Sequence, residues 1–285
     1  MTVRRTISRF LWILAVAAVF AGCSKENKIS VMSFNIRVCP DETADGANNW
    51  QFRREAVTAM IMQTSPDLIG IQEGLYPQVN YMEDNLPGYV RFGVEREDAQ
   101  ERGEANAIFL KKDRFDILDK GTFWISETPD TVSLGWDAAY RRTVTWAKIR
   151  DRKGGREILF FNTHFDHVGD TARLEAGNLI ERKLMELSEE GQPVFLTGDF
   201  NSNFDSKYLD PVRNYMQNAR ETALESCDWN TFNNWGTIAP DGEKKSVIDH
   251  IFYRNARALK YEVLTGGYGA EYISDHYPIV LTAEI

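Results

Sequence analysis

The segment "FFNTHFDHVGD", residues 160 to 170, joins the end of a strand pattern to a run of polar side chains. The apolar run "EILFFN" (157 to 162) has the length and composition of a strand in a buried sheet. His164, Asp166 and His167 follow it directly. Because side chains alternate across an extended chain, we expect His164 and Asp166 on one face and His167 on the other. The two histidines are therefore not expected to share a metal ion.

The same kind of β-rich run recurs along the chain. The further runs are "ISVMSFNI" (29 to 36), "DLIGIQ" (67 to 72), "NAIFL" (106 to 110), "TVTWAKI" (143 to 149), "PVFLTG" (193 to 198), "VIDHIFY" (247 to 253) and "PIVLTAEI" (278 to 285). Helical patterns cover residues 53 to 64, before Pro66, and residues 171 to 190, with Asp170 or Thr171 as the N-cap and Gly191 as the terminator. Strands dominate without a strict strand-helix alternation. This predicts an α+β fold of two packed sheets flanked by helices, not a doubly wound parallel sheet.

The N-terminal residues have the parts of a signal peptide. Arg4, Arg5 and Arg9 precede the apolar run "FLWILAVAAVFA" (10 to 21), which small residues follow. The ending "FAGC" resembles a bacterial lipoprotein box, which implies a signal peptide over residues 1 to 22 and a lipid on Cys23. We then expect a polar tether over residues 23 to 28, a single domain over residues 29 to 285, and export to the periplasmic or outer-membrane surface of the cell envelope. An uncleaved anchor or an ordinary secretory signal is the alternative.

Composition places the rest of the chain among globular proteins and limits its partners. The 285 residues are 43% hydrophobic and 26% charged, with a formal charge of -9. Loss of the three arginines in residues 1 to 22 would change that charge to -12. Since nucleic-acid binding depends largely on phosphate neutralisation by Lys and Arg, a long nucleic acid is not expected as a partner. The sequence leaves open whether Cys39 and Cys227 pair.

Polar side chains stand at the ends of the predicted strands. They are Asn35, Glu73, His164, Asp199, Asn201, Asp249, His250, Asp275 and His276, and all four histidines of the chain fall in these segments. Such groups at the edge of a core need partners or a bound ion, because unpaired burial costs several kcal/mol. The set is rich in carboxylates and lacks paired cysteines, so it favours Mg²⁺, with Mn²⁺ as the alternative, over Zn²⁺.

The motifs together resemble a known superfamily. "SFNIR" (33 to 37), "IQE" (71 to 73), "NTHFDH" (162 to 167), "GDFNS" (198 to 202), "SVIDHIF" (246 to 252) and "SDHYP" (274 to 278) occur in the order and spacing of the endonuclease/exonuclease/phosphatase superfamily. The resemblance covers nearly the whole mature chain. It implies the fold of deoxyribonuclease I, a four-layered α/β sandwich of two mainly antiparallel sheets with the active site at one end.

The resemblance also implies roles for the matching residues. Asn35, Glu73 and Asp275 would hold the metal, and Asn201 would contact phosphoryl oxygens. Asp199 would orient or deprotonate the attacking water, and His276, paired with Asp249, would bind or protonate phosphate oxygen; either is a candidate for the general base. His164 would lie on the leaving-group side, with Asp166 bracing it or binding a substrate hydroxyl. His167 and His250 are expected to be structural.

Other residues are candidates for substrate binding. Arg141 in "YRRT" resembles the phosphate-clamping position of the family, with Tyr140 and Arg142 as adjacent alternatives. Trp136 and Trp235, in polar turn-rich segments, could rim a pocket and stack on a base, sugar or lipid. The charged run "VEREDAQERGE" (94 to 104) is expected to be a solvated loop.

These expectations converge on an exported, lipid-anchored, Mg²⁺-dependent phosphoesterase that hydrolyses its ester by in-line attack of water. The substrate classes left open are a sugar phosphate, a phospholipid head group and a short nucleotide, and a monomer is expected. The alternatives are a catalytically silent surface binding protein with the same fold and a nuclease acting on short nucleic acids. A calcineurin-type metallophosphatase does not fit, because its Asp-x-His and Gly-Asn-His motifs are absent.

Overall fold

The computed structural model describes residues 27–285. The predicted signal peptide (residues 1 to 22), Cys23 and most of the predicted tether lie outside these residues. Within residues 27–285, no helix is long and apolar enough to cross a membrane. Cys39 and Cys227, whose pairing the sequence left open, are both free thiols.

Two six-stranded sheets form the centre of the molecule. The first sheet has the order β13 (Arg257–Val263), β14 (Ile279–Glu284), β1 (Lys28–Asn35), β2 (Leu68–Gln72), β6 (Ile108–Lys111) and β4 (Tyr89–Phe92). The second has the order β11 (Gln217–Asn218), β12 (Asp249–Arg254), β10 (Val194–Asp199), β9 (Glu157–His164), β8 (Thr143–Asp151) and β7 (Phe115–Trp124). Only the pairs β1–β2 and β9–β10 are parallel. A short sheet pairs β3 (Gly74–Leu75) with β5 (Glu104–Ala105).

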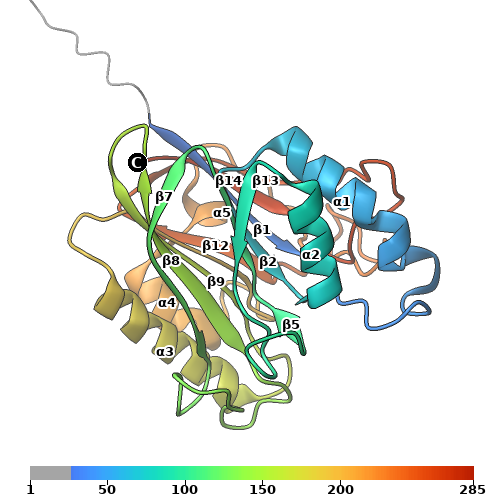
Figure 1. The fold of residues 1–285 in the computed structure, drawn as a ribbon, viewed down its shortest axis with the longest axis horizontal. Coiled ribbons are helices and arrows are strands. Elements are labelled where there is room, and N and C mark those ends of the chain that lie inside the picture. Colours follow the sequence, from blue (N-terminus) through green and yellow to red (C-terminus); the bar gives the residue numbers. More distant parts are fainter. Residues whose placement is uncertain (1–26) are drawn as a thin grey trace, which may run out of the picture.

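Helices cover the outer face of each sheet (Figure 1). The first sheet is covered by α1 (Trp50–Thr64) and α2 (Tyr76–Asn85), and the second by α3 (Asp170–Leu187) and α4 (Asp210–Tyr215). The remaining short helices are η1 (Gly46–Asn48), η2 (Lys207–Leu209) and α5 (Ala219–Thr222). The result is the predicted four-layered sandwich of mainly antiparallel sheets.

Alternating side chains of each strand supply two different cores. In β1, Val31 packs between the sheets with Phe160 and Phe195, whereas Met32 packs outward against α1. In β9, Phe160 likewise faces the first sheet while Phe161 faces α3. This double burial explains why these strands are continuous apolar runs, and it fixes their register, since a slip of one residue would exchange the two faces.

The predicted helix ends differ from the observed ones. Helix α1 begins at Trp50, where the side chain of Asn49 accepts a hydrogen bond from the Gln51 N–H. The predicted N-caps of α3, Asp170 and Thr171, are wrong, because Gly169 is the cap. The N–H groups of Thr171 and Ala172 in the first turn donate to the carboxylate of Asp137, which is distant in the sequence. The predicted end at Gly191 is also wrong, since the helix stops at Leu187. A capping group supplied from a distant loop cannot be seen in the local sequence.

Candidate active site

The strand ends of both sheets meet at one edge of the sandwich. Asp199 is the last residue of β10, and it lies opposite His164 in β9 and Asp249 in β12. Asn35 ends β1 in the other sheet, and its Nδ2 donates to Asp199 Oδ2 at 3.0 Å and to Glu73 Oε1 at 2.9 Å. Parallel pairing within each sheet and packing between the sheets therefore bring together residues far apart in the chain.

Asp199 is the centre of this group. Its Oδ2 lies 3.6 Å from Nε2 of His164 and 3.7 Å from Nε2 of His276, while Oδ1 accepts the Asn201 N–H at 2.8 Å. Burial, followed by the nearby charge of Asp249, raises the pKa of Asp199 to about 7. A carboxylate with a pKa near neutrality can both accept and release a proton under ordinary conditions.

His276 is held between two carboxylates. Its Nδ1 lies 2.9 Å from Asp249 Oδ2, and the ring is 4% exposed. Burial lowers the pKa of His276, but the charge and hydrogen bond of Asp249 and the charge of Asp199 raise it to about 10. His276 is thus an imidazolium that donates hydrogen bonds at neutral pH, and it is not suited to act as a base.

His164 differs from His276 in its charge. Burial, with the cations Arg142 and Arg96, lowers its pKa well below the ordinary value, so the ring is neutral. Its Nε2 lies 3.0 Å from Nδ2 of Asn201, and its buried Nδ1 has no partner within residues 27–285. The site therefore contains one charged and one neutral imidazole, on opposite sides of Asp199.

The residues predicted to bind metal form an oxygen-rich group. Glu73 accepts hydrogen bonds from Asn35 and from the Val38 N–H; burial opposes ionisation, but these bonds and nearby cations keep the pKa of Glu73 below its usual range. Burial raises the pKa of Asp275, although the charges of His276 and of Arg37, 3.8 Å away, act in the opposite direction. A buried carboxylate close to a second ionised one suits a hard divalent cation.

The side-chain geometry extends the possible metal group beyond the predicted set. Ligand atoms of Glu73, His164 and Asp199 lie within 4.8 Å of one another, as do those of Asp199, Asp249 and His276. Among the described residues, Asp275 belongs to neither of these clusters. Glu73 is the residue common to the predicted set and the first cluster, so it is the best-supported ligand.

The cluster lies at the bottom of a cavity of about 900 Å³. Predicted residues in its wall are Glu73, His164, Asp199, Asn201, Trp235, Asp275 and His276. Further residues that line it are Arg37, Asp45, Arg96, Glu104, Tyr140, Arg142, His167, Phe232 and Asn234. The volume suits a small ligand, and charged and polar side chains make up most of the residues in the wall.

Some predicted residues lie elsewhere or are otherwise occupied. The guanidinium of Arg141 bonds Glu97 at 2.5 Å, and neither Arg141 nor Trp136 is among the residues that line the cavity. Asp166 is 2% exposed, and its oxygens accept the N–H groups of Ala139, Val168 and Gly169. Asp166 therefore holds the loop after β9, and this loop contact takes the place of the predicted contact with His164.

The two histidines expected to be structural have different surroundings. His250 is buried, with Nε2 donating to the Ser202 carbonyl at 2.9 Å and Nδ1 beside Asn218, as expected of a structural residue. His167 instead lines the cavity and stacks on Tyr140, with ring centroids 5.9 Å apart. Both histidines line the same cavity, so the prediction that His167 faces away from His164 is not supported; β9 ends at His164, and the alternation argument does not extend past that residue.

A wall of cations includes Arg142, which the sequence offered only as an alternative to Arg141, and Arg96, which it did not single out. Arg142 is 5% exposed, and its nearest carboxylates are Asp166 at 3.6 Å and Glu104 at 4.0 Å. Arg96 pairs with Glu104 at 2.7 Å, so part of the run 94 to 104, expected to be a solvated loop, is a buried cavity wall. The only sequence signal was the neighbouring "YRRT" motif, which could not tell Arg141 from Arg142.

Comparisons with known proteins agree with this geometry. The model of the endonuclease/exonuclease/phosphatase family matches residues 32–276. The structure of a mannosyl-6-phosphatase from Bacteroides thetaiotaomicron VPI-5482 is 34% identical, with a TM-score of 0.84, over 90% of this chain and 100% of that one. An endonuclease/exonuclease/phosphatase from Bacteroides vulgatus is also 34% identical, with a TM-score of 0.84, over 90% of this chain and 99% of that one. An uncharacterized protein of Acanthamoeba polyphaga mimivirus, L388, is 24% identical over 82% of this chain and 92% of its own length.

Proposed function

The chain belongs to the endonuclease/exonuclease/phosphatase family, and we propose that it is a Mg²⁺-dependent phosphatase that hydrolyses a sugar phosphate monoester. The observation that supports the chemistry best is the position of Asp199 between the charged His276 and the neutral His164, 3.7 and 3.6 Å away. The similarity to the mannosyl-6-phosphatase, 34% identical over 90% of this chain, supports the sugar phosphate.

Asp199 is the proposed general base. Its pKa of about 7 lets it take a proton from the attacking water, whereas the pKa of about 10 of His276 keeps that ring protonated. The His276 imidazolium, oriented by Asp249, binds the phosphoryl oxygens as negative charge develops on them. Asn201 would donate from the His164 side, where its Nδ2 lies 3.0 Å from Nε2 of His164.

The metal ligands are proposed to be Glu73, Asp275 and Asn35, which offer the carboxylate and amide oxygens that Mg²⁺ prefers. When bound, a divalent cation would supply charge neutralisation for the phosphoryl group. Hydrogen bonds hold Asn35 in place independently of a bound cation, because its side chain donates to Glu73 and its carbonyl accepts from Ser274.

The sugar would occupy the polar walls of the cavity. On one wall, Arg37 pairs with Asp45, and the half-buried Trp235, which also lines the cavity, could stack on a pyranose. On the other, Arg142, Tyr140 and His167 offer hydrogen bonds to hydroxyl groups. The acidic charge of the chain favours a small monoester over a nucleic acid.

The location and assembly of the protein remain part of the proposal. The sequence "FAGC" supports export and a lipid on Cys23, which would hold the domain at the surface of the cell envelope. We propose that the protein is a monomer.

A panel of substrates tests the proposed function. Mannose 6-phosphate, glucose 6-phosphate, bis(4-nitrophenyl) phosphate, a short oligonucleotide and a phospholipid would each be assayed with Mg²⁺, with Mn²⁺ and with chelator. We expect phosphate release from the sugar monoesters that chelation abolishes. Faster cleavage of the diester or the oligonucleotide would favour the nuclease alternative, and binding of a sugar phosphate without turnover would favour the silent binding protein.

A further inference from the structure

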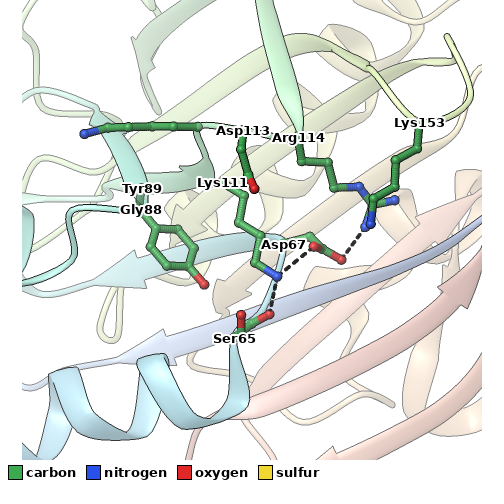
Figure 2. Close-up of a pocket in the computed structure, with 9 residues that line it drawn as sticks. Ser65, Asp67, Gly88, Tyr89, Lys111, Asp113, Arg114 and Lys153 are labelled. Carbon is green, nitrogen blue, oxygen red and sulfur yellow. Dashed lines mark hydrogen bonds and ion pairs between the residues drawn. The ribbon is translucent and has the colours of Figure 1, made fainter.

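A second cavity, of about 510 Å³, lies at the opposite end of the strands from the active site and is rich in cations (Figure 2). Two turns supply them, "KKDR" (111 to 114) between β6 and β7 and "DRKGGR" (151 to 156) between β8 and β9. Lys111, Lys112, Arg114 and Lys153 line the cavity together with the acids Asp67 and Asp113. The two turns hold six cations and two acids, in a chain whose overall charge is negative.

The acids of this cavity divide the cations into two groups. Buried Arg114 pairs with Asp67 at 2.6 Å and with Asp151 at 2.7 Å, and Lys111 pairs with Asp67 at 3.0 Å. These pairs neutralise one another and hold the two turns together. Lys112 and Lys153, which with Asp113 form an exposed rim of the cavity, have no ion pair within residues 27–285. The rim thus keeps an unpaired positive charge.

The N-terminal end of the described chain lies against this rim. Nη2 of Arg114 donates to the Lys28 carbonyl at 2.9 Å and to Asn27 Oδ1 at 3.4 Å. Gly154, next to Lys153, is also packed against the Asn27 side chain. In the sequence, Cys23 precedes Asn27 by only four residues, a length of chain that can span at most about 14 Å. A lipid on Cys23 would therefore keep the rim close to the membrane surface.

We propose that this basic rim docks on an anionic bilayer surface and sets the orientation of the anchored protein; the proposal rests on the lipid anchor of the proposed function. Each Lys or Arg near an anionic surface adds about 1 kcal/mol of attraction, which acts within a Debye length of about 8 to 10 Å. The acidic remainder of the molecule is repelled by the same surface. Attraction at one end and repulsion elsewhere favour a single orientation.

The orientation has a consequence for the substrate. Lys28 begins β1 beside the rim, and Asn35 ends the same strand in the active site. An eight-residue strand separates these ends by about 23 Å, at about 3.3 Å per residue. With the rim on the membrane, the active site opens away from it. The substrate would then be a soluble phosphate ester, and the phospholipid head groups of the same bilayer would be out of reach.

Vesicle binding tests the docking without reference to activity. The chain from Cys23 to Ile285, which contains every described strand and helix, would be sedimented with vesicles of phosphatidylcholine alone or mixed with phosphatidylglycerol. We expect binding to the mixed vesicles only, lost at high salt. The Lys112→Glu/Lys153→Glu variant should bind at least about tenfold more weakly, which corresponds to about 1.4 kcal/mol. The matched control is Lys207→Glu/Lys244→Glu, which makes the same charge change with exposed lysines outside this rim.

The results separate this proposal from the proposed function. Equal loss of binding in both double variants, or equal binding to both kinds of vesicle, would overturn the docking surface. Binding of inorganic phosphate at the rim without vesicle binding would also overturn it, in favour of a soluble anion site. Release of phosphatidylglycerol products from vesicles that carry the lipidated chain would overturn the orientation. Absence of sugar phosphate hydrolysis would contradict the proposed function and leave the vesicle result unaffected.

Discussion

Nδ1 of His276 lies 2.9 Å from Asp249 Oδ2, while Nε2 of the same ring faces Asp199 Oδ2 at 3.7 Å. One imidazole thus lies between two buried carboxylates at unequal distances. The closer carboxylate keeps the ring protonated, while burial, followed by the like charge of Asp249, raises the pKa of Asp199 to about 7. This difference between two neighbouring groups is the basis of the first two predictions.

Replacing Asp249 by asparagine should lower activity through His276. The Asp249→Asn variant keeps the shape of the side chain but removes the charge that raises the pKa of His276, so the ring loses its proton at a lower pH. We expect kcat/KM to fall about 10²- to 10⁴-fold at neutral pH and the alkaline limb of the pH profile to move to lower pH. Exposed Asp241→Asn is the control. An unchanged alkaline limb would show that Asp249 does not govern the charge of His276.

Replacing Asp199 by asparagine should abolish hydrolysis and raise the free energy of unfolding above pH 7. The folded-state pKa of about 7 is above the unfolded value of 3.8, so the folded state binds more protons between these values. The free energy of unfolding of the wild type therefore falls as pH rises through this window, by roughly 1 to 4 kcal/mol. Asn cannot ionise, so Asp199→Asn should be more stable than the wild type above pH 7 and similar to it near pH 4, while hydrolysis is lost.

Urea denaturation in the presence of chelator, at several pH values, measures this difference. The exposed Asp205→Asn variant is the control, since its carboxylate is outside the cluster. A variant less stable than the wild type above pH 7 would mean that the Asn35 and Asn201 hydrogen bonds to Asp199 outweigh the cost of its buried charge.

The sequence predicted two packed sheets flanked by helices because most strands of the sandwich are buried on both faces. Such strands are continuous apolar runs, for example "ILFF" in β9. The four-layered architecture, which the family resemblance implied, is confirmed. Strands whose outer faces are exposed were not recognised: β7 is largely exposed along its middle, and β13 alternates between buried and exposed positions. Helix α2 was missed because its sequence, "YPQVNYMEDN", has few apolar residues.

The site was predictable where residues end a strand and not where they belong to loops. Asn35, His164 and Asp199 end buried strands, and the structure brings them together. The loop residue Arg96 reaches the same cavity through tertiary packing that has no local signal, and the "YRRT" motif could not decide between Arg141 and Arg142. Arg142 directly precedes β8, and its carbonyl accepts a hydrogen bond from the Ile125 N–H. Its side chain lines the cavity, whereas that of Arg141 does not.

The two adjacent arginines provide a matched test of the cavity wall. Buried Arg142 lines the cavity, whereas Arg141 pairs with Glu97 and does not. We expect Arg142→Gln to lower kcat/KM about 10- to 100-fold, mainly through KM, because a charged hydrogen bond contributes about 1.5 to 3 kcal/mol. Arg141→Gln should stay within about threefold of the wild type, a change of less than 1 kcal/mol. Steady-state kinetics on the best sugar phosphate measures both, and a larger effect from Arg141→Gln would restore the original prediction.

Removal of a metal ligand should be visible without any substrate. Binding of a cation to the folded state alone raises the melting temperature, and the free energy of unfolding rises by about 2.7 kcal/mol at 100 times the dissociation constant. We expect Mg²⁺ to stabilise the wild type, measured by differential scanning calorimetry against chelator. Glu73→Gln should lose this shift, and Asp275→Asn should weaken it. Glu104→Gln, a carboxylate in the same cavity beside Arg96, is the control. An equal shift in Glu73→Gln would exclude that residue as a ligand.

Buried His250 should make the protein less stable in mild acid. Burial, with the cations Arg220 and Arg213, lowers its pKa from 6.5 to about 4, although the Ser202 carbonyl and Asp249 oppose this. Between these values the unfolded state binds the extra proton, so the stabilising contribution is complete above pH 6.5 and is lost as pH falls towards 4. The loss amounts to about 3 kcal/mol.

The test compares the wild type with His250→Gln, which can keep a donor to Ser202 and an acceptor for Asn218. The difference in the free energy of unfolding between the two proteins should change with pH from 6.5 to 4, because the background from other groups, Asp199 included, is common to both. Exposed His167→Gln removes a histidine without affecting this site, so its difference from the wild type should not reproduce the change. If the free energy of unfolding of His250→Gln falls by the same amount as that of the wild type between pH 6.5 and 4, His250 does not cause the acid sensitivity.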